Sequence, residues 1–326
     1  MTLVVLAAWL VVYFAAIRPW FLDWGSTADE RSGPLPGQDL APAGAESHTR
    51  AVTIDAPPDR VWPWLAQIGI GRAGFYSYTW LENLICAGIH NTYRVKALWQ
   101  DRRAGDFVRS FQFGAEKAGF SGWRMEPFED GKYFFLNPGW GPFVLAPRDT
   151  SQTRFFIRSW RSRMNPVTGA LMALAFDPIH FTMEKRMMVE VKRLAERRPT
   201  APVWIIILAW LGFGFAGITA AGVIISRQRR KLWILVPDFW ALACLVVAND
   251  PQAALTAFTA CCLIIGGFRL FGRRGWAWIL GFWIFVDLVL IYAGDAFLVF
   301  GLVFLVAAPI GLVLMLKNRV QPMSAA

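Results

Sequence analysis

Charged residues are scarce in this chain of 326 residues, since Asp, Glu, Lys and Arg together make up 17% of it. Soluble globular proteins carry about 25% charged residues. Hydrophobic residues reach 56%, and the mean hydropathy is +0.39. The chain also has 17 tryptophans and 26 phenylalanines, and aromatic residues are enriched where a membrane meets water. The composition therefore predicts an integral membrane protein.

Cysteine and histidine are also rare, with four and three copies. The cysteines are Cys86, Cys244, Cys261 and Cys262, and the histidines are His48, His90 and His180. Three of the cysteines lie in apolar stretches, where cysteine behaves as a small hydrophobic residue. The spacings offer neither a disulfide framework nor a Cys-x-x-Cys metal site. We expect no metal and no cofactor.

The formal charge of +10 does not indicate a nucleic-acid partner. In the C-terminal part, the basic residues form three short clusters beside apolar stretches, at 227–231, 269–274 and 317–319. A phosphate-binding protein instead gathers its basic residues on one face or along one helix. This distribution is typical of membrane topology signals, so we expect no nucleic acid to bind.

Six apolar stretches are long enough to cross a bilayer, which requires about 20 mostly apolar residues. They are 2–22, 203–226, 232–248, 252–270, 276–294 and 296–316. The first lacks a basic start and a small-residue cleavage site before Arg18, so a retained anchor is favoured over a cleaved signal peptide. The sequence thus predicts one N-terminal span and a C-terminal bundle of about five spans, from 203 to 326.

The basic loops predict which side of the membrane each segment faces. Loops rich in Lys and Arg stay in the cytoplasm, which places the C-terminus there and the domain between the first two spans outside the cell membrane. The basic cluster at 192–198 opposes this orientation. Two acids, Asp238 and Asp287, fall inside predicted spans. Buried in a bilayer, such acids mark either a functional site or a contact between helices.

Between the first two spans, residues 23–47 are rich in Gly, Pro and Ala and are interpreted as a linker. A folded domain is predicted over residues 48–198. It begins with an alternating strand at 50–55 and a helix after Pro57, and a second short helix follows near residue 80. Further strands are expected at 107–113, 122–127, 133–136, 143–146 and 153–160.

A long helix is expected to close this domain. Asp177 suits an N-cap and Pro178 the first helical position. Hydrophobic residues then recur at helical spacing. Glu184 is interpreted as a structural residue paired with the neighbouring Lys185 or Arg186. The element order predicts an α+β domain in which an antiparallel sheet wraps on this C-terminal helix.

Several segments resemble one known superfamily. They are Thr49–Pro57 with Val61–Leu65, Gly74–Asn83, Trp99–Asp101 with Gly105 and Asp106, and His180–Met187. Together they resemble the SRPBCC superfamily, the START-like helix-grip group of polyketide cyclases/dehydrases and lipid-transport proteins. The resemblance covers about residues 48–198. It implies a helix-grip fold with a cavity between sheet and C-terminal helix. It does not imply one activity, because the superfamily hosts carriers, enzymes and structural modules.

A glycine pattern, Gly69-x-Gly71-x-x-Gly74, matches the dinucleotide-binding spacing. That motif works only after a strand and at the start of a helix within a βαβ unit. Here it follows a predicted helix, so the glycines are interpreted as a connector between helices.

Aromatic, methionine and polar side chains are the candidates for lining the implied cavity, because such sites combine apolar area with a few orienting polar groups. The candidates are Phe75, Tyr76, Tyr78, Trp80, Arg109, Arg158, His180, Met183 and Met187. Each also has an interpretation as a core or structural residue. No set of nucleophile, base and acid can be assembled from the spacing.

The leading functional hypothesis is a membrane-tethered module that binds an apolar small molecule, such as a lipid, isoprenoid or quinone, at the bilayer surface. Its expected partners are membrane lipids and that ligand. A second hypothesis is an accessory subunit of a larger integral membrane complex. A third is an enzyme of the cyclase/dehydratase kind with Tyr, His or Arg as acid or base, which ranks last because no catalytic set is visible.

Overall fold

The computed structural model describes residues 7–113 except 9 and 37, residues 121–199 and residues 235–271, with scattered helical positions between 204 and 221. The chain divides into two compact units. Unit 1 comprises Met1–Thr79 and Ile89–Pro199, and unit 2 comprises Trp80–Gly88 and Thr200–Ala326.

Unit 1 is built on a six-stranded antiparallel sheet with the order β1-β6-β5-β4-β3-β2. The strands are β1 (Glu46–Ile54), β2 (Phe107–Arg109), β3 (Gly122–Glu129), β4 (Tyr133–Asn137), β5 (Gly141–Pro147) and β6 (Thr153–Arg161). Strands β2 to β6 follow one another as a meander, and β1 returns to pair with β6, with Arg50 opposite Ile157. The predicted antiparallel sheet is present.

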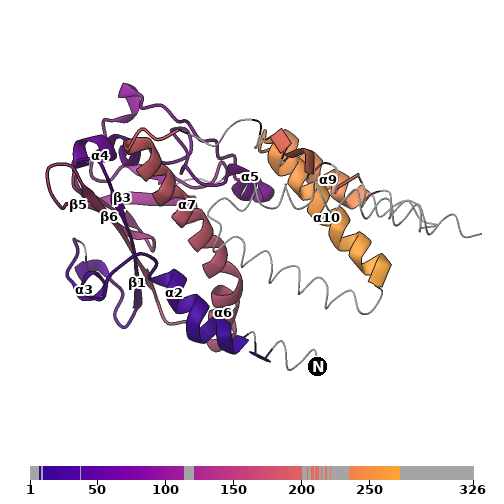
Figure 1. The fold of residues 1–326 in the computed structure, drawn as a ribbon, viewed down its shortest axis with the longest axis horizontal. Helices are drawn as coiled ribbons and strands as arrows, with labels where there is room; N and C mark the ends of the chain where they lie inside the picture. The colour runs from indigo at the N-terminus through magenta and orange to yellow at the C-terminus, as the bar shows by residue number, and fades with distance from the viewer. Residues whose placement is uncertain are drawn as a thin grey trace, which may run out of the picture. The chain divides into compact units, whose positions relative to one another are not determined.

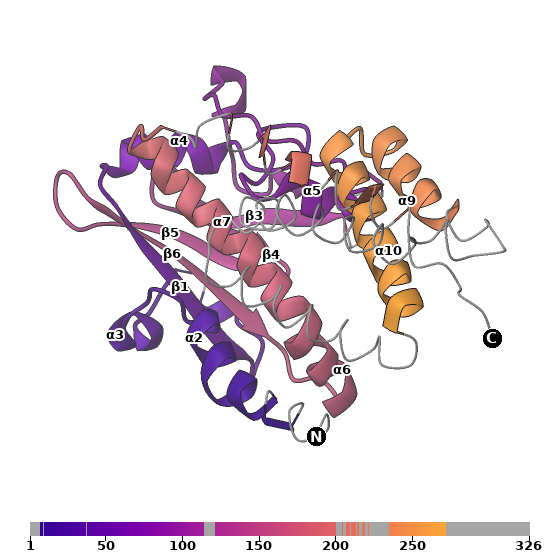
Figure 2. The same ribbon diagram turned by 45° about the vertical axis from the view of Figure 1, so that its right-hand side comes forward.

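The longest helix of unit 1, α7 (Asp177–Ala195), lies across one face of this sheet (Figures 1 and 2). We call this face the inner face. The other helices of unit 1 are α2 (Arg18–Leu22), α3 (Ala28–Ser32), α4 (Pro58–Ala66) and α6 (Pro166–Leu171). Short π turns (Tyr13–Ile17, Met172–Phe176) and 3-10 turns (Gln38–Leu40, Ala97–Trp99) complete it, and α5 (Thr79–Glu82) begins at its boundary.

The core of unit 1 lies on the inner face and is largely aromatic. Phe134, Phe143 and Phe155 are fully buried on three neighbouring strands. Phe143 stacks on Phe134 with ring centroids 4.9 Å apart and lies 6.1 Å from Phe155. Trp62 of α4 packs on Phe134 at 5.8 Å. Burying such large side chains is the main favourable term in folding.

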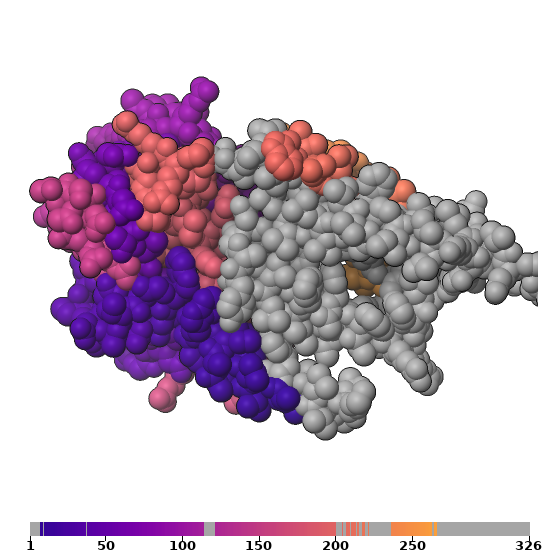
Figure 3. Space-filling model, viewed as in Figure 1, coloured from indigo at the N-terminus to yellow at the C-terminus, as the bar shows by residue number. Residues whose placement is uncertain are grey.

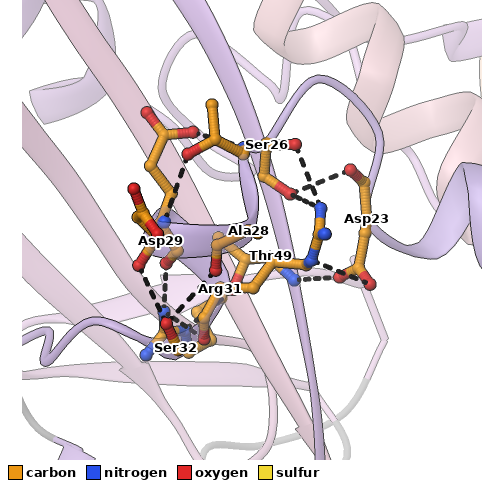
Figure 4. A network of polar contacts seen from close by, with 10 residues as sticks. Asp23, Ser26, Ala28, Asp29, Arg31, Ser32 and Thr49 are labelled. Atoms are coloured by element: carbon orange, nitrogen blue, oxygen red, sulfur yellow. Dashed lines mark hydrogen bonds and ion pairs between the residues drawn. The ribbon is translucent and has the colours of Figure 1, made fainter.

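The outer face of the sheet is covered by residues 23–36, the first part of the predicted linker. Arg158 is buried there, and its guanidinium donates to the hydroxyl of Thr49 at 2.8 Å and to backbone carbonyls at the end of α3. Figure 4 shows how Asp23 fixes the start of this segment by accepting the backbone N–H of Thr49 at 2.9 Å. Arg31 donates to the Ser26 carbonyl at 3.1 Å in the same network.

The N-terminal segment packs against the rest of unit 1. Residues 13–22 fold into a π turn and the short helix α2, and Tyr13 and Phe21 are buried within unit 1. Phe21 stacks on Phe181 of α7 at 5.2 Å, and the Tyr13 hydroxyl donates to the carbonyl of Ala173. In the space-filling view the indigo N-terminal atoms pack directly against the rest of the unit (Figure 3).

Among the described helices, none is both long enough and apolar enough to cross a membrane. Helix α9 (Leu235–Val246) lies in the predicted span 232–248. Helix α10 (Pro251–Phe271), in the predicted span 252–270, is longer. It holds Gln252, Thr256 and Thr259 in its first half, which lowers its apolar character.

The predicted multi-pass architecture is therefore wrong for the part of the chain that the structure describes, including the N-terminal anchor at 2–22. The predicted cell-membrane localisation and the orientation drawn from the basic loops are wrong for the same reason, because both depended on those spans. The predicted spans 276–294 and 296–316 lie outside the described residues, as does most of 203–226.

Unit 2 joins two distant parts of the sequence. Its 3-10 turn at Asn83–Ile85 packs with α9 and α10. The Asn83 amide donates to Asp250 at 2.7 Å, and the Trp240 indole N–H donates to the Leu84 carbonyl at 2.9 Å. Asp250 also accepts the backbone N–H groups of Gln252 and Ala253, so its carboxylate caps the start of α10.

Candidate functional site

Three titratable side chains share one face of α7 in unit 1. Asp177, His180 and Glu184 are spaced by three and four residues, which places them above one another on a helix. All three contact groups on the inner face of the sheet or the segments beside it. Buried charges of this kind persist only when they are paired and hydrogen-bonded.

Glu184 is held by two donors from different elements. Arg50 Nη1 of β1 lies 2.7 Å from Oε1, and the indole N–H of Trp140, in the turn between β4 and β5, donates to Oε2 at 2.7 Å. Burial raises the pKa of the Glu184 carboxyl, but Arg50, His180 and the hydrogen bonds outweigh burial, so that the pKa is lowered overall. The structure therefore pairs Glu184 with Arg50 rather than with the expected Lys185 or Arg186.

Asp177 connects α7 to two arginines. Its Oδ2 lies 2.9 Å from Arg18 of α2, and Arg161 of β6 binds both carboxylate oxygens. Burial raises the pKa of Asp177, but the hydrogen bonds and charges of Arg161 and Arg18 lower it overall. The helical backbone continues through Asp177 from the preceding π turn. The predicted N-cap is therefore wrong, and the carboxylate instead forms an ion pair.

His180 lies between these two acids with its imidazole partly accessible. Its side chain is 24% exposed, and Nε2 lies 3.7 Å from Oε2 of Glu184. Burial lowers the pKa of His180, and Arg50 and Arg161 lower it further, while Glu184 and Asp177 act in the opposite direction. The net pKa is below the usual 6.5, so the imidazole is neutral near pH 7.

A second histidine lies near the same arginines. Burial, together with Arg50, Arg18 and Arg161, lowers the pKa of His48 on β1, and Asp23 only partly offsets this. Its buried Nε2 has no hydrogen-bond partner among the residues that the structure describes. Within those residues, no three His, Cys, Asp or Glu side chains are grouped so as to hold a metal ion.

Aromatic rings lead from the core to His180. We call Phe75, Trp123, Trp140, His180 and Phe176 the aromatic row. Trp140 lies 4.7 Å from Trp123, 5.8 Å from Phe75 and 5.7 Å from His180 between ring centroids. His180 in turn stacks on Phe176 at 5.3 Å. Phe176 is 48% exposed, and the two tryptophans are half-buried, so part of the row is open to a ligand.

The structure thus brings two of the predicted site residues, Phe75 and His180, together on either side of Trp140. Tyr76 is buried elsewhere in unit 1, with its hydroxyl accepting the Gln67 amide at 2.7 Å, and burial raises its pKa. Tyr78 is buried under the guanidinium of Arg186, which lies 5.3 Å from its ring centroid.

The other predicted site residues are not in the row. On α7, Met187 is buried and Met183 is half-buried. Arg109 is exposed at the end of β2, where it donates to the Gln112 carbonyl at 3.4 Å, and Arg158 is on the outer face. Trp80 belongs to unit 2. Asp238 is exposed in the first turn of α9, and Asp287 is outside the described residues.

The glycine pattern makes the turn that precedes Phe75. Gly69 and Gly74 pair as a short antiparallel bridge, through backbone hydrogen bonds of 2.8 and 3.1 Å. Gly74 has a φ of +70°, and a Cβ there would lie 2.6 Å from the Asn91 side chain. Only glycine fits such a position without strain. The loop lies between α4 and α5, as the connector interpretation expected.

Sequence reasoning missed Arg50 and Trp140, the two side chains that fix Glu184. One signal for Arg50 was available, since it alternates with Val52 and Ile54 on the face of a strand that is expected to be buried. Trp140 stands in a Pro-Gly-Trp-Gly turn, and nothing in that local sequence indicates a partner more than 40 residues away.

Comparisons with protein-family models, with curated proteins and with solved structures gave no match to this chain. The resemblance to the SRPBCC superfamily therefore stays a prediction that depends on the segments quoted above.

Proposed function

We propose that unit 1 binds a small hydrophobic molecule that carries a ring, of the isoprenoid or quinone class, on the aromatic row. The observation that carries the proposal is that several rings from separate elements contact one another in a row that reaches the surface beside a buried Arg50–Glu184 pair. Offset and edge-to-face contacts with such rings favour a planar ligand by about 0.5–1.5 kcal/mol per pair beyond area burial. The SRPBCC resemblance supports the same class of ligand.

The burial of apolar ligand surface is enough to give useful affinity without a charged contact. A ligand that buries ~400 Å² of apolar surface gains roughly 10 kcal/mol at about 25 cal/mol per Å². The lost freedom of the ligand reduces this gain toward micromolar affinity. Because the Arg50 and Glu184 charges already neutralise each other, an uncharged ligand is favoured over an acid.

The test uses the purified full chain and 2-methyl-1,4-naphthoquinone as the probe. A bound ligand is expected to raise the melting temperature and to quench tryptophan fluorescence. Trp123→Ala should weaken binding by up to about tenfold, because the ligand loses contact with one ring of the aromatic row. Trp160→Ala is the matched control, since Trp160 is a half-buried tryptophan on the outer face that stacks on Phe135 at 5.1 Å.

Organic extraction of the purified protein followed by mass spectrometry identifies any ligand retained from the cell. Equal binding by the Trp123 and Trp160 variants, or no binding by the unsubstituted chain, contradicts the proposal.

A further inference from the structure

The geometry points to His180 as a general acid–base residue that exchanges a proton with the ligand on the aromatic row, with Glu184 as its positioning residue. This inference rests on the proposed function and extends it from binding to chemistry.

The first support is the placement of the imidazole. His180 is a member of the row, stacked on Phe176 at 5.3 Å and edge-on to Trp140 at 5.7 Å. Its side chain keeps 24% of its surface exposed. A ligand that stacks on the exposed part of the row therefore lies next to an accessible ring nitrogen, which proton transfer requires.

The second support is the way Glu184 is fixed. Its carboxylate is 1% exposed and is held at both oxygens, by Arg50 and by Trp140, each at 2.7 Å. Oε2 faces Nε2 of His180 at 3.7 Å. A fixed carboxylate beside one imidazole nitrogen stabilises the imidazolium that forms when the other nitrogen takes a proton. Nδ1 of His180 has no hydrogen-bond partner within the described residues.

The third support is the balance of charges around the ring. Burial, Arg50 and Arg161 lower the pKa of His180, and Glu184 and Asp177 raise it. The result is an imidazole that is neutral near pH 7 and able to accept a proton, with a carboxylate beside it that favours the protonated form.

The step needs no oxidant or reductant. The imidazole forms an N–H bond with a proton from a C–H group next to a ligand carbonyl, and the electron pair of that C–H bond stays on the ligand as an enolate. Return of the proton to another atom of the enolate regenerates neutral His180. The reaction class is therefore enolisation or isomerisation of a hydrophobic carbonyl compound.

The test uses 5-nitrobenzisoxazole, a planar aromatic probe of general bases, with the full chain. The base takes the C3 proton, the carbon–nitrogen bond becomes a nitrile, and the nitrogen–oxygen bond breaks with its electron pair on the phenolate oxygen, which is coloured. General-base catalysis predicts a rate about 10²-fold or more above buffer. His180→Gln should return the rate to the buffer value, and His90→Gln, at an exposed loop position, should leave it unchanged.

The pH profile separates a positioning role from a structural one. Because Glu184 raises the pKa of His180, Glu184→Gln should shift the midpoint of the rate profile to lower pH. Added imidazole should raise the rate with His180→Ala above the rate of the same imidazole in buffer, which shows that this variant folds. A buffer-level rate for the unsubstituted chain, or full activity of His180→Gln, overturns the inference. If the unsubstituted chain binds naphthoquinone but lacks this activity, only the inference about His180 is overturned. If it shows neither binding nor activity, the proposed function is overturned as well.

Discussion

At the scale of single residues, the most unusual group outside the candidate site is Glu82 in unit 2. Its side chain is buried, and Oε2 has no hydrogen-bond partner among the described residues. Burial raises the pKa of this carboxyl from 4.5 to about 8. A buried carboxyl without a cation is stable only in its protonated form, so Glu82 is neutral at pH 7 in the folded chain and ionised in the unfolded chain.

This difference predicts a pH dependence of stability. The folded state binds the Glu82 proton more tightly, so its contribution is complete below pH 4.5 and is lost as the pH rises through about 8. The slope is about 1.4 kcal/mol per pH unit between these values. Glu82→Gln should remove this slope in urea unfolding between pH 5 and 8. Glu129→Gln, at an exposed position, should keep it, and parallel slopes for all three proteins would contradict the burial of Glu82.

At the scale of elements, the Asp177 ion pairs attach the N-terminal helix α2 and strand β6 to α7. Arg18 and Arg161 each bind this carboxylate with side chains that are less than one-fifth exposed. Because the pKa of Asp177 is lowered in the folded state, its contribution to stability is present above pH 3.8 and is lost as the pH falls through the folded-state value.

Asp177→Asn is therefore expected to cost about 3 kcal/mol, because two partly buried arginines lose their carboxylate. The cost should appear in urea unfolding at pH 7. Chymotrypsin should also cut faster after Phe21, which is fully buried in unit 1. Asp101→Asn removes an exposed pair with Arg103 and should cost less than about 1 kcal/mol. Equal stability of the two variants would show that Asp177 does not anchor α2.

The strands and α7 of unit 1 were predictable from local sequence, whereas the role of residues 13–22 was not. Strands such as β6 show β-branched and aromatic residues between turn signals, and these features act over a few residues. An apolar segment such as 13–22 has the same composition whether it meets lipid or a protein core. Its docking depends on Phe181 and Asp177, about 160 residues away, and a local pattern carries no information on such partners.

The candidate site was only partly predictable, for the same reason. His180 and Phe75 were selected because aromatic and titratable residues suit a cavity, but the row exists because Trp140 joins them. Arg158 was selected by the same rule and lies on the outer face, where it binds the carbonyls at the end of α3. Residue type suggests a role, but strand register and loop geometry decide on which face the side chain lies.

At the scale of the whole molecule, unit 1 exposes many large apolar side chains on two segments, 11–20 and 164–179. The segments touch through Tyr13 and Ala173 and lie side by side in Figure 2. We call the exposed side chains the apolar patch: Val11, Val12, Phe14, Trp20, Met164, Val167, Leu171, Leu174, Phe176 and Ile179. Exposed apolar side chains gathered on neighbouring segments mark a site of interaction.

The patch predicts that the purified chain associates through unit 1. Val167 and Leu171 on α6 are 71% and 65% exposed, and burying each gains roughly 1.5–3 kcal/mol. Replacing both, Val167→Glu with Leu171→Lys, should weaken association at least tenfold in sedimentation velocity. Leu98→Lys is the control, because Leu98 is 85% exposed but lies in the 3-10 turn Ala97–Trp99, outside the patch. If the control dissociates the protein as strongly as the α6 variant, general surface charge rather than the patch governs association. If neither changes it, the contact lies elsewhere on the chain.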